Sequence, residues 1–160
     1  MEIGFGTGRF LKETARLLTT GCIEGIDFSH TMVVMAKKRN KRGIAKGRVR
    51  IQHGDFETEM YEDDSYDAVC SANTIYFWSH PDNAVEKIFR MLRPGGKVIL
   101  AFEDIDQLEG RPLDTGVFHL YSTRDIEDLL RRNGFREEID IITKKKGSQK
   151  FHCVVATKDA

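Results

Sequence analysis

Glycines occupy every second position close to the start of the chain, at Gly4, Gly6 and Gly8. Because glycine has no Cβ, the backbone at these positions can adopt positive φ and can approach another molecule closely. Apolar residues flank the first two glycines, and from Gly8 onward apolar residues recur at helical spacing up to residue 18. The pattern predicts the end of a strand, a glycine turn and the start of a helix, an arrangement suited to binding a ligand through the backbone.

Two predicted strands, residues 22–28 and 48–56, each end near an acidic residue, Asp27 and Asp55 respectively. Asp27 lies 19 residues after Gly8, close to the offset at which an acid meets ribose hydroxyls in dinucleotide-binding folds. A carboxylate there suits a 2′-hydroxyl and repels a 2′-phosphate. Asp27 could instead cap the following helix, although Ser29 already offers that cap.

A run of aromatic residues follows the predicted strand 66–73 in the stretch "NTIYFWSH". Its aromatic side chains could form an apolar or cation–π wall, and His80 has an intrinsic pKa suited to general base catalysis near neutrality. Two alternatives stay open: Phe77 or Trp78 could be packing core, and His80 could simply precede the next helix. We predict His80 and Tyr76 as catalytic candidates, and Tyr76, Trp78, His119 and Tyr121 as substrate-binding candidates that would contact the molecule acted upon.

The substrate-binding candidates His119 and Tyr121 belong to a long segment of mixed composition, residues 103–122, which suits a loop over an active site. The histidines of the chain show no metal-ligand spacing, so we predict no metal. Three cysteines without a CxxC pair indicate reduced thiols and a cytoplasmic protein.

Strand-like and helix-like segments alternate along most of the chain, which predicts an α/β fold with a doubly wound, mostly parallel sheet and helices on both faces. The last two predicted strands, residues 136–143 and 150–158, are joined by only six residues. A parallel crossover needs about a dozen residues, so these strands must form an antiparallel hairpin. The length of 160 residues fits a single domain, residues 1–160.

Five motifs, "EIGFGTG", "GIDFS", "GDFE", "YDAVCSANTIYFW" and "LRPGGKVIL", occur in this order. Their order and spacing resemble the class I, Rossmann-like S-adenosylmethionine-dependent methyltransferases, especially the quinone-biosynthesis branch, over nearly the whole chain. The resemblance implies a sheet of the seven-stranded type, S-adenosylmethionine as cofactor, and methyl transfer to a small-molecule acceptor by in-line displacement. A cofactor-binding module without turnover remains an alternative, and a nicotinamide oxidoreductase is a weaker one.

The resemblance also assigns roles to residues around the cofactor. It places the glycine turn under the methionine part, Glu2 near the ammonium group, and Asp27 against the ribose hydroxyls. Phe28 and Met32 would flank the adenine; the alternative is that both are ordinary core residues. Asp55 would accept a hydrogen bond from the adenine amino group; the alternative is that it only stabilises a turn. The implied cofactor-binding residues are Glu2, Gly4, Gly6, Gly8, Asp27, Phe28, Met32, Asp55, Phe56 and Asn73.

Charges balance at 25 Lys and Arg against 25 Asp and Glu, so no net charge points to nucleic acid or to a membrane as partner. We therefore interpret the basic stretch of residues 37–50 as a solvated helix face followed by a loop. Relatives of the family usually begin further upstream, with a helical segment before the first strand. We accordingly expect a truncated first strand without the N-terminal helical cap, whose exposed region could form a homodimer.

Overall fold

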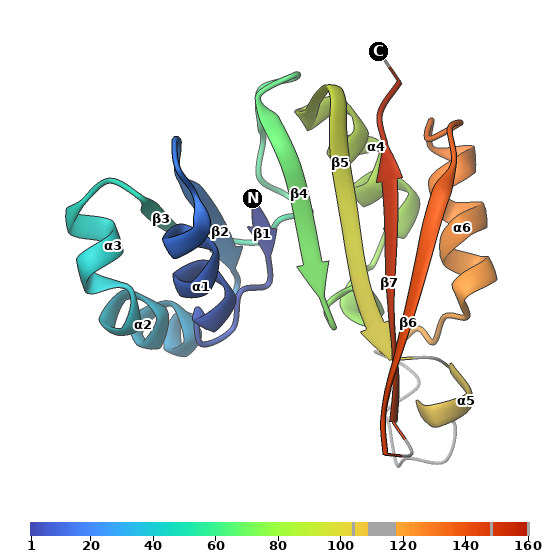
Figure 1. Cartoon of the computed structure of the whole chain (residues 1–160), viewed down its shortest axis with the longest axis horizontal. Helices are drawn as coiled ribbons and strands as arrows, with labels where there is room; N and C mark the ends of the chain where they lie inside the picture. Colours follow the sequence, from blue (N-terminus) through green and yellow to red (C-terminus); the bar gives the residue numbers. More distant parts are fainter. Residues whose placement is uncertain (104, 109–117, 148, 160) are drawn as a thin grey trace. The chain divides into compact units, whose positions relative to one another are not determined.

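The computed structural model describes residues 1–159 except 104, 109–117 and 148. The chain divides into two compact units, unit 1 with residues 1–60 and unit 2 with residues 61–160 (Figure 1). The single domain expected for residues 1–160 stays a prediction.

Unit 1 contains three parallel strands in the order β3-β2-β1. Its helices begin after turns that the sequence marks, and the Ser29 side chain caps α2 by accepting a hydrogen bond from the Met32 N–H at 3.4 Å. The elements are β1 (Glu2–Ile3), α1 (Arg9–Leu17), β2 (Ile23–Asp27), α2 (His30–Arg39), α3 (Lys41–Ala45) and β3 (Val49–His53).

The core of unit 1 forms where α1 and α2 pack on the strands. Leu11 of α1 and Ala36 of α2 are fully buried, and α2 buries Val33 together with Ala36, three residues apart on one face, while its neighbouring apolar residues are exposed. The core cluster consists of Phe5, Leu11, Ile23, Val33, Ala36 and Val49. This packing fixes the two helices that start next to the glycine turn and next to Asp27.

Unit 2 contains four strands in the order β4-β5-β7-β6, with β4 parallel to β5 and the last two pairs antiparallel. The hairpin predicted from its short connection is confirmed. The elements are β4 (Tyr66–Ala72), the 3-10 helix η1 (Ile75–Phe77), α4 (Pro81–Met91), β5 (Leu92–Glu103), α5 (Ile105–Leu108), α6 (Thr123–Arg132), β6 (Ile139–Lys146) and β7 (Gln149–Thr157).

The predicted fold class is confirmed: the described residues form an α/β structure with seven strands, mostly parallel and closed by an antiparallel hairpin. Two local predictions were wrong. Residues 41–45 of the basic stretch form α3 and not a loop. Pro94, Gly95 and Gly96 predict a turn after a helix, with the next strand from Lys97 onward. Strand β5 instead begins at Leu92, because Tyr66 pairs with Leu92 before the register shifts, so these residues form an irregularity within the strand.

Candidate functional site

The glycine turn of unit 1 connects β1 to α1 through backbone that only glycine adopts readily. Gly4, Gly6 and Gly8 have φ values of 69°, 51° and 70°. The Gly4 N–H continues the ladder by donating to the Ile26 carbonyl at 2.8 Å, and the Gly8 N–H closes the turn on the Phe5 carbonyl at 2.9 Å. The predicted turn is therefore present, with all of its glycines in the left-handed region.

The space around these glycines differs. A Cβ on Gly8 would lie 2.7 Å from Ala36 Cβ and 2.7 Å from Asn40 Nδ2, whereas a Cβ on Gly6 would meet nothing within 4 Å. Gly8 is thus required for the close packing of α1 against α2. Gly6 leaves open space beside the backbone, which is where another molecule can approach the turn.

Asp27 holds the glycine turn from the end of β2. Its Oδ2 accepts the Gly6 N–H at 2.8 Å and its Oδ1 accepts the Ser29 N–H at 2.9 Å. The residue is 7% exposed. A carboxylate has roughly four lone-pair positions, so acceptor capacity remains for hydroxyl donors. Ser29 is the N-cap of α2, and the alternative that Asp27 serves as that cap is wrong.

Glu2 places a second carboxylate in unit 1, in β1 next to the turn. It is 5% exposed, and its Oε2 has no hydrogen-bond partner among the described residues. The pKa of the Glu2 carboxyl is raised to about 7, mainly by burial; the positive charge of the N-terminus and a hydrogen bond from the Leu11 backbone oppose the shift, and the charge of Asp27 adds to it. A buried acceptor without a partner is unusual, and a cationic donor would satisfy it.

Beyond β2, the aromatic ring of Phe28 is left uncovered. Phe28 is 73% exposed, so the alternative that it is a core residue is wrong, while Met32 is half-buried on α2. His53 lies beside it, with Nε2 3.0 Å from the Phe28 carbonyl oxygen, and its ring is tilted by 56° against that of His30 at 5.6 Å between centroids. These exposed rings provide a surface suited to a flat apolar group.

Asp55 and Phe56 follow β3 in a turn. The Asp55 Oδ1 accepts the Glu57 N–H at 2.9 Å, and its carbonyl accepts the Thr58 N–H at 3.1 Å. Phe56 is buried at 5% exposure. Asp55 therefore stabilises the turn, as one of the two sequence interpretations expected, and its contact with an adenine amino group stays a prediction.

Asn73 follows β4 in unit 2 with φ 56°, a left-handed conformation that is uncommon outside glycine. Its N–H donates to the Ala101 carbonyl at 2.8 Å, which extends the pairing of β4 with β5 by one residue. Strained backbone of this kind is frequent at binding sites. The Asn73 side chain is exposed, and its contact with a cofactor stays a prediction.

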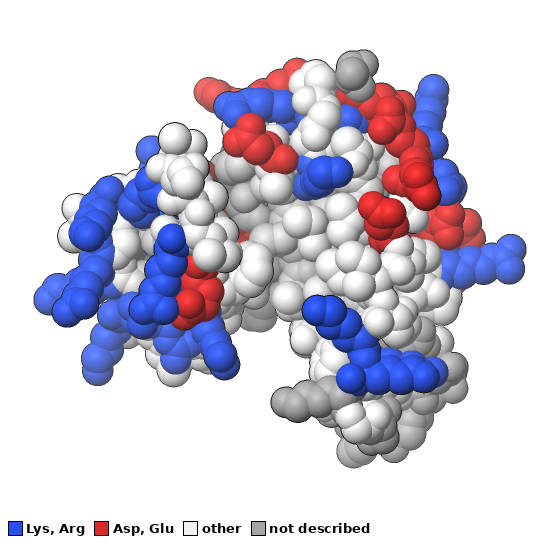
Figure 2. Space-filling model, in the orientation of Figure 1, with Lys and Arg blue, Asp and Glu red and all other residues white. Residues whose placement is uncertain are grey.

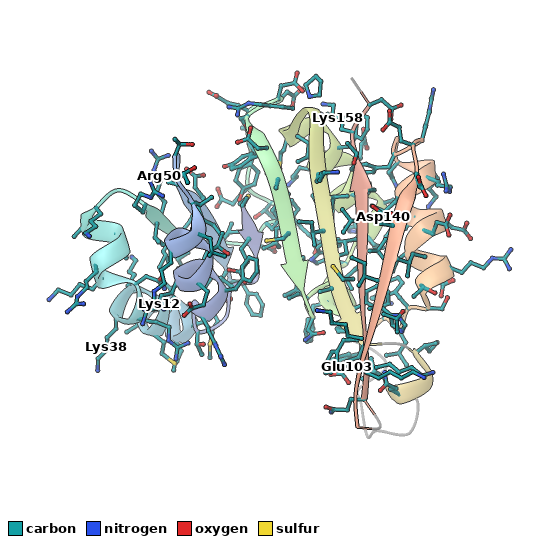
Figure 3. All side chains as sticks on the ribbon, viewed as in Figure 1. Lys12, Lys38, Arg50, Glu103, Asp140 and Lys158 are labelled. Carbon is teal, nitrogen blue, oxygen red and sulfur yellow. The ribbon has the colours of Figure 1, made fainter. Side chains whose placement is uncertain are left out.

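Tyr76 is fixed by the backbone of Glu103, which Figure 3 labels at the end of β5. Its hydroxyl donates to the Glu103 carbonyl at 3.1 Å and accepts the Glu103 N–H at 2.5 Å. The side chain is 4% exposed, as is that of Trp78. Both hydrogen-bonding directions of the hydroxyl are thus occupied, which gives Tyr76 a structural role, and its catalytic role stays a prediction.

Phe118 packs against the aromatic residues that follow β4. Its ring stacks on Tyr76 at 5.8 Å between centroids and meets Phe77 edge to face at 4.6 Å. The His119 N–H donates to the Tyr76 carbonyl at 2.9 Å, so two of the predicted acceptor contacts are neighbours. Phe77 is 44% exposed and gives this aromatic cluster a free surface.

The catalytic candidate His80 and the acceptor candidate Tyr121 lie near the starts of α4 and α6. His80 is exposed at the N-cap position of α4, where its carbonyl accepts the Ala84 N–H at 3.0 Å. Burial raises the pKa of the Tyr121 hydroxyl, and the charge of Asp82 adds to the shift. Residues 104 and 109–117 of the expected active-site loop lie outside the described part of the chain.

Comparison with known proteins decides the family. The sequence profile described as "Methyltransferase domain" matches residues 1–100. The chain belongs to this methyltransferase family. It is 30% identical to the uncharacterized methyltransferase YdaC of Bacillus subtilis over 160 residues, all of this chain and 83% of that protein. It is 31% identical to the ubiquinone/menaquinone biosynthesis C-methyltransferase UbiE of Geotalea daltonii over 101 residues, 62% of this chain and 43% of that protein.

Solved structures agree with this family. A Thermotoga maritima S-adenosylmethionine-dependent methyltransferase, titled a possible histamine N-methyltransferase, is 26% identical with a TM-score of 0.74, covering 99% of this chain and 80% of that chain. A Haemonchus contortus phosphoethanolamine N-methyltransferase 2 with bound S-adenosylhomocysteine is 18% identical with a TM-score of 0.83, covering 99% and 48%, and shows the common fold alone.

This methyltransferase therefore uses S-adenosylmethionine as its cofactor. Two features of unit 1 fit that molecule: the open space beside Gly6 and the unpartnered carboxylate oxygen of Glu2, which suit a close backbone approach and an ammonium group. No group of His, Cys, Asp and Glu among the described residues is arranged to hold a metal ion, and the predicted absence of a metal stays a prediction. Within the same residues, no helix has the length and apolar character needed to cross a bilayer.

The sequence interpretation missed Asn40. This residue is 2% exposed, and its Nδ2 donates to the Gly8 carbonyl at 2.9 Å and to the Ala36 carbonyl at 3.0 Å. It therefore ties the glycine turn to the end of α2. An Asn inside a basic run resembles an ordinary helix end, so no signal in the sequence distinguished it.

Proposed function

We propose that this methyltransferase transfers the methyl group of S-adenosylmethionine to a small-molecule acceptor by in-line displacement. The observation that carries the proposal is the Asp27 clamp, in which one buried carboxylate holds the Gly6 and Ser29 amides and retains acceptor capacity. A site whose polar groups are already held in place loses little conformational freedom on binding. The clamp thus favours an adenosine-containing ligand with a free ribose diol.

Within unit 1, three side chains and the glycine turn divide the recognition of the cofactor. The free lone pairs of Asp27 accept the ribose hydroxyls, and the unpartnered Oε2 of Glu2 accepts from the ammonium group. The exposed ring of Phe28 packs against the adenine. The open space beside Gly6 admits the amino-acid part of the ligand.

The cofactor supplies a methyl group on a positively charged sulfur, which is already activated for displacement. The protein then mainly has to hold the acceptor close and aligned. Phe77 and Phe118 of the aromatic cluster offer an apolar surface for an acceptor ring, and exposed His80 is available as a base if the acceptor must lose a proton. Quinone-like and amine acceptors are both consistent with such a surface.

Calorimetric titration with S-adenosylhomocysteine tests the cofactor half of the proposal. We expect saturable binding by the wild-type chain, no competition by NAD, and at least a tenfold loss of affinity in Asp27→Ala. Asp67→Ala is the matched control, because Asp67 is an exposed carboxylate whose salt bridge with Arg93 at 2.7 Å lies in unit 2. Equal affinity of Asp27→Ala and wild type, with both variants folded, would contradict the assigned site.

Transfer of a labelled methyl group to a panel of quinols, phenols and amines tests the acceptor half. The chain spans 43% of the UbiE protein that it matches, so relatives of that kind contain further segments. Cofactor binding without transfer to any acceptor would support the alternative of a binding module that needs a partner. The homodimer and the cytoplasmic location stay predictions.

A further inference from the structure

The two units carry opposite net charges, although the chain as a whole is neutral. Residues 1–60 contain eleven Lys and Arg against seven Asp and Glu, and residues 61–160 contain fourteen against eighteen. Ten of the eleven cations of unit 1 lie between residues 9 and 48, which also contain only three acids. Lys and Arg side chains cover much of the visible surface of this unit in Figure 2.

These cations surround a recess on the helical side of unit 1. The recess has a volume of about 870 Å³, and its walls come from α1, from the end of α2, from α3 and from the start of β3. Eight of the thirteen residues that line it are Lys or Arg, and none is aromatic or acidic. Lys38 and Arg39 are exposed on α2, as expected for a solvated helix face, and α3, which stands where a loop was expected, supplies a further wall of the recess.

Three of the lining cations have partners within unit 1, and two of these contacts link separate segments of the wall. Arg39 donates to the Thr7 carbonyl at 3.1 Å, and Arg48 donates to the Thr19 carbonyl at 3.3 Å. Arg16 forms a salt bridge of 3.0 Å with an acidic residue one turn earlier on α1. The walls of the recess are thus held by contacts within unit 1.

The side chains of the other five lining cations form no hydrogen bond or ion pair with the described residues. The helix dipole accounts for Lys38, which lies in the last turn of α2. It does not account for Lys12 in the middle of α1, or for Lys41, which is the first residue of α3, where the dipole disfavours a cation. These five residues are Lys12, Lys38, Lys41, Arg42 and Lys46.

Unpaired like charges around one recess repel each other, and a multivalent anion removes that repulsion. Ammonium and guanidinium groups together bind phosphate oxygens through charge-assisted hydrogen bonds. The absence of aromatic lining residues disfavours single-stranded nucleic acid, which binds largely by stacking its bases. The volume falls within the range of small-ligand pockets, about 300–1,000 Å³.

We propose that this basic recess is a binding site for a compact oligophosphate anion, separate from the cofactor site. None of the residues assigned to the cofactor lines the recess. Figure 3 labels two of the cations that would contact the anion, Lys12 and Lys38, on the helices of unit 1. The proposal does not depend on methyl transfer.

Titration of the full chain with inorganic tripolyphosphate at low ionic strength tests this site. We expect saturable binding that weakens steeply as salt is added, and a loss of at least tenfold in affinity in the double variant K38Q/K41Q. The matched control is K144Q/K145Q, which removes two exposed lysines from β6 in unit 2 and should bind as wild type. Circular dichroism and S-adenosylhomocysteine affinity should be unchanged in both variants.

Three results would overturn the proposal. The first is no saturable binding of tripolyphosphate by a folded chain. The second is an equal loss of affinity in both double variants, which would indicate only diffuse attraction. The third is tight binding of an RNA duplex without measurable binding of tripolyphosphate, which would make the recess part of a nucleic-acid surface.

Discussion

Replacement of Gly8 by alanine should destabilise the protein far more than the same replacement at Gly6. Both glycines have positive φ, 70° and 51°, so both variants place a Cβ on left-handed backbone. Only the Cβ of Gly8→Ala meets other atoms, at 2.7 Å from Ala36 Cβ and from Asn40 Nδ2. The pair therefore separates backbone strain from packing within one turn.

The magnitudes follow from these two contributions. Left-handed backbone costs an alanine roughly 1–2 kcal/mol, and this cost applies to both variants. Overpacking of a well-packed core costs about 1–3 kcal/mol and applies to Gly8→Ala alone. We expect Gly8→Ala to lose about 2–5 kcal/mol of unfolding free energy and Gly6→Ala about 1–2 kcal/mol. The entropy that alanine removes from the unfolded chain is the same in both variants and cancels in their difference.

Urea denaturation followed by far-ultraviolet circular dichroism measures this difference. Tryptophan fluorescence is less suitable, because the single tryptophan, Trp78, lies in unit 2 while both substitutions lie in unit 1. Gly6→Ala should nevertheless lower S-adenosylhomocysteine affinity, since its methyl group occupies the open space beside the turn. Equal midpoints for the two variants, or a lower midpoint for Gly6→Ala, would refute the assignment of Gly8 to packing.

Three further changes test individual side chains. Glu2→Gln should stabilise the protein at pH 8 but not at pH 4. Because the pKa of the Glu2 carboxyl is raised from 4.5 to about 7 in the folded protein, its contribution to stability is fully present below pH 4.5 and is lost as the pH rises through 7. The gain in unfolding free energy of Glu2→Gln at pH 8 relative to pH 4 should reach about 3 kcal/mol, measured by urea titration at the two pH values. Tyr76→Phe should cost about 1–3 kcal/mol in thermal unfolding, since it removes both hydrogen bonds between the Tyr76 hydroxyl and the Glu103 backbone, whereas a purely catalytic hydroxyl would leave stability unchanged. Asn73 has φ 56°, so Asn73→Gly should be neutral or stabilising, and Asn73→Val should destabilise the protein by about 1–2 kcal/mol. Equal urea midpoints for the two variants would argue against backbone strain at this position.

Local sequence signals predicted those features that depend on neighbours in the chain. Ser29 caps α2 as expected, because this cap needs only a side chain and an amide three residues later. The C-terminal hairpin followed from the length of its connection. These elements were predictable because their chemistry is contained within a few residues.

Features that depend on distant residues were not predictable. The three glycines of the turn look equivalent in the sequence, and only the packing of α2 shows that Gly8 is tied to Ala36 and Asn40. The Tyr76 hydroxyl looks like a catalytic candidate until the end of β5 is placed beside it. The basic recess likewise depends on residues of α1 and α3 lining the same hollow, and the spacing of residues 37–50 does not predict that arrangement.

Asp27 connects the stability of the turn to the binding of the cofactor, and amide hydrogen exchange can separate the two. In the free protein its carboxylate accepts the Gly6 and Ser29 amides, so both should exchange slowly before any ligand is added. Asp27→Ala should abolish that protection, while the Glu57 amide, held by a different carboxylate, should keep its rate. Fast exchange at Gly6 in the wild type, with protection only after S-adenosylhomocysteine is added, would mean that the ligand and not Asp27 orders the turn. In that case the affinity lost in Asp27→Ala would measure only the direct contact between Asp27 and the ligand. If the Gly6 amide exchanges slowly in the free wild type, the lost affinity instead includes both this contact and the preorganisation of the turn by Asp27.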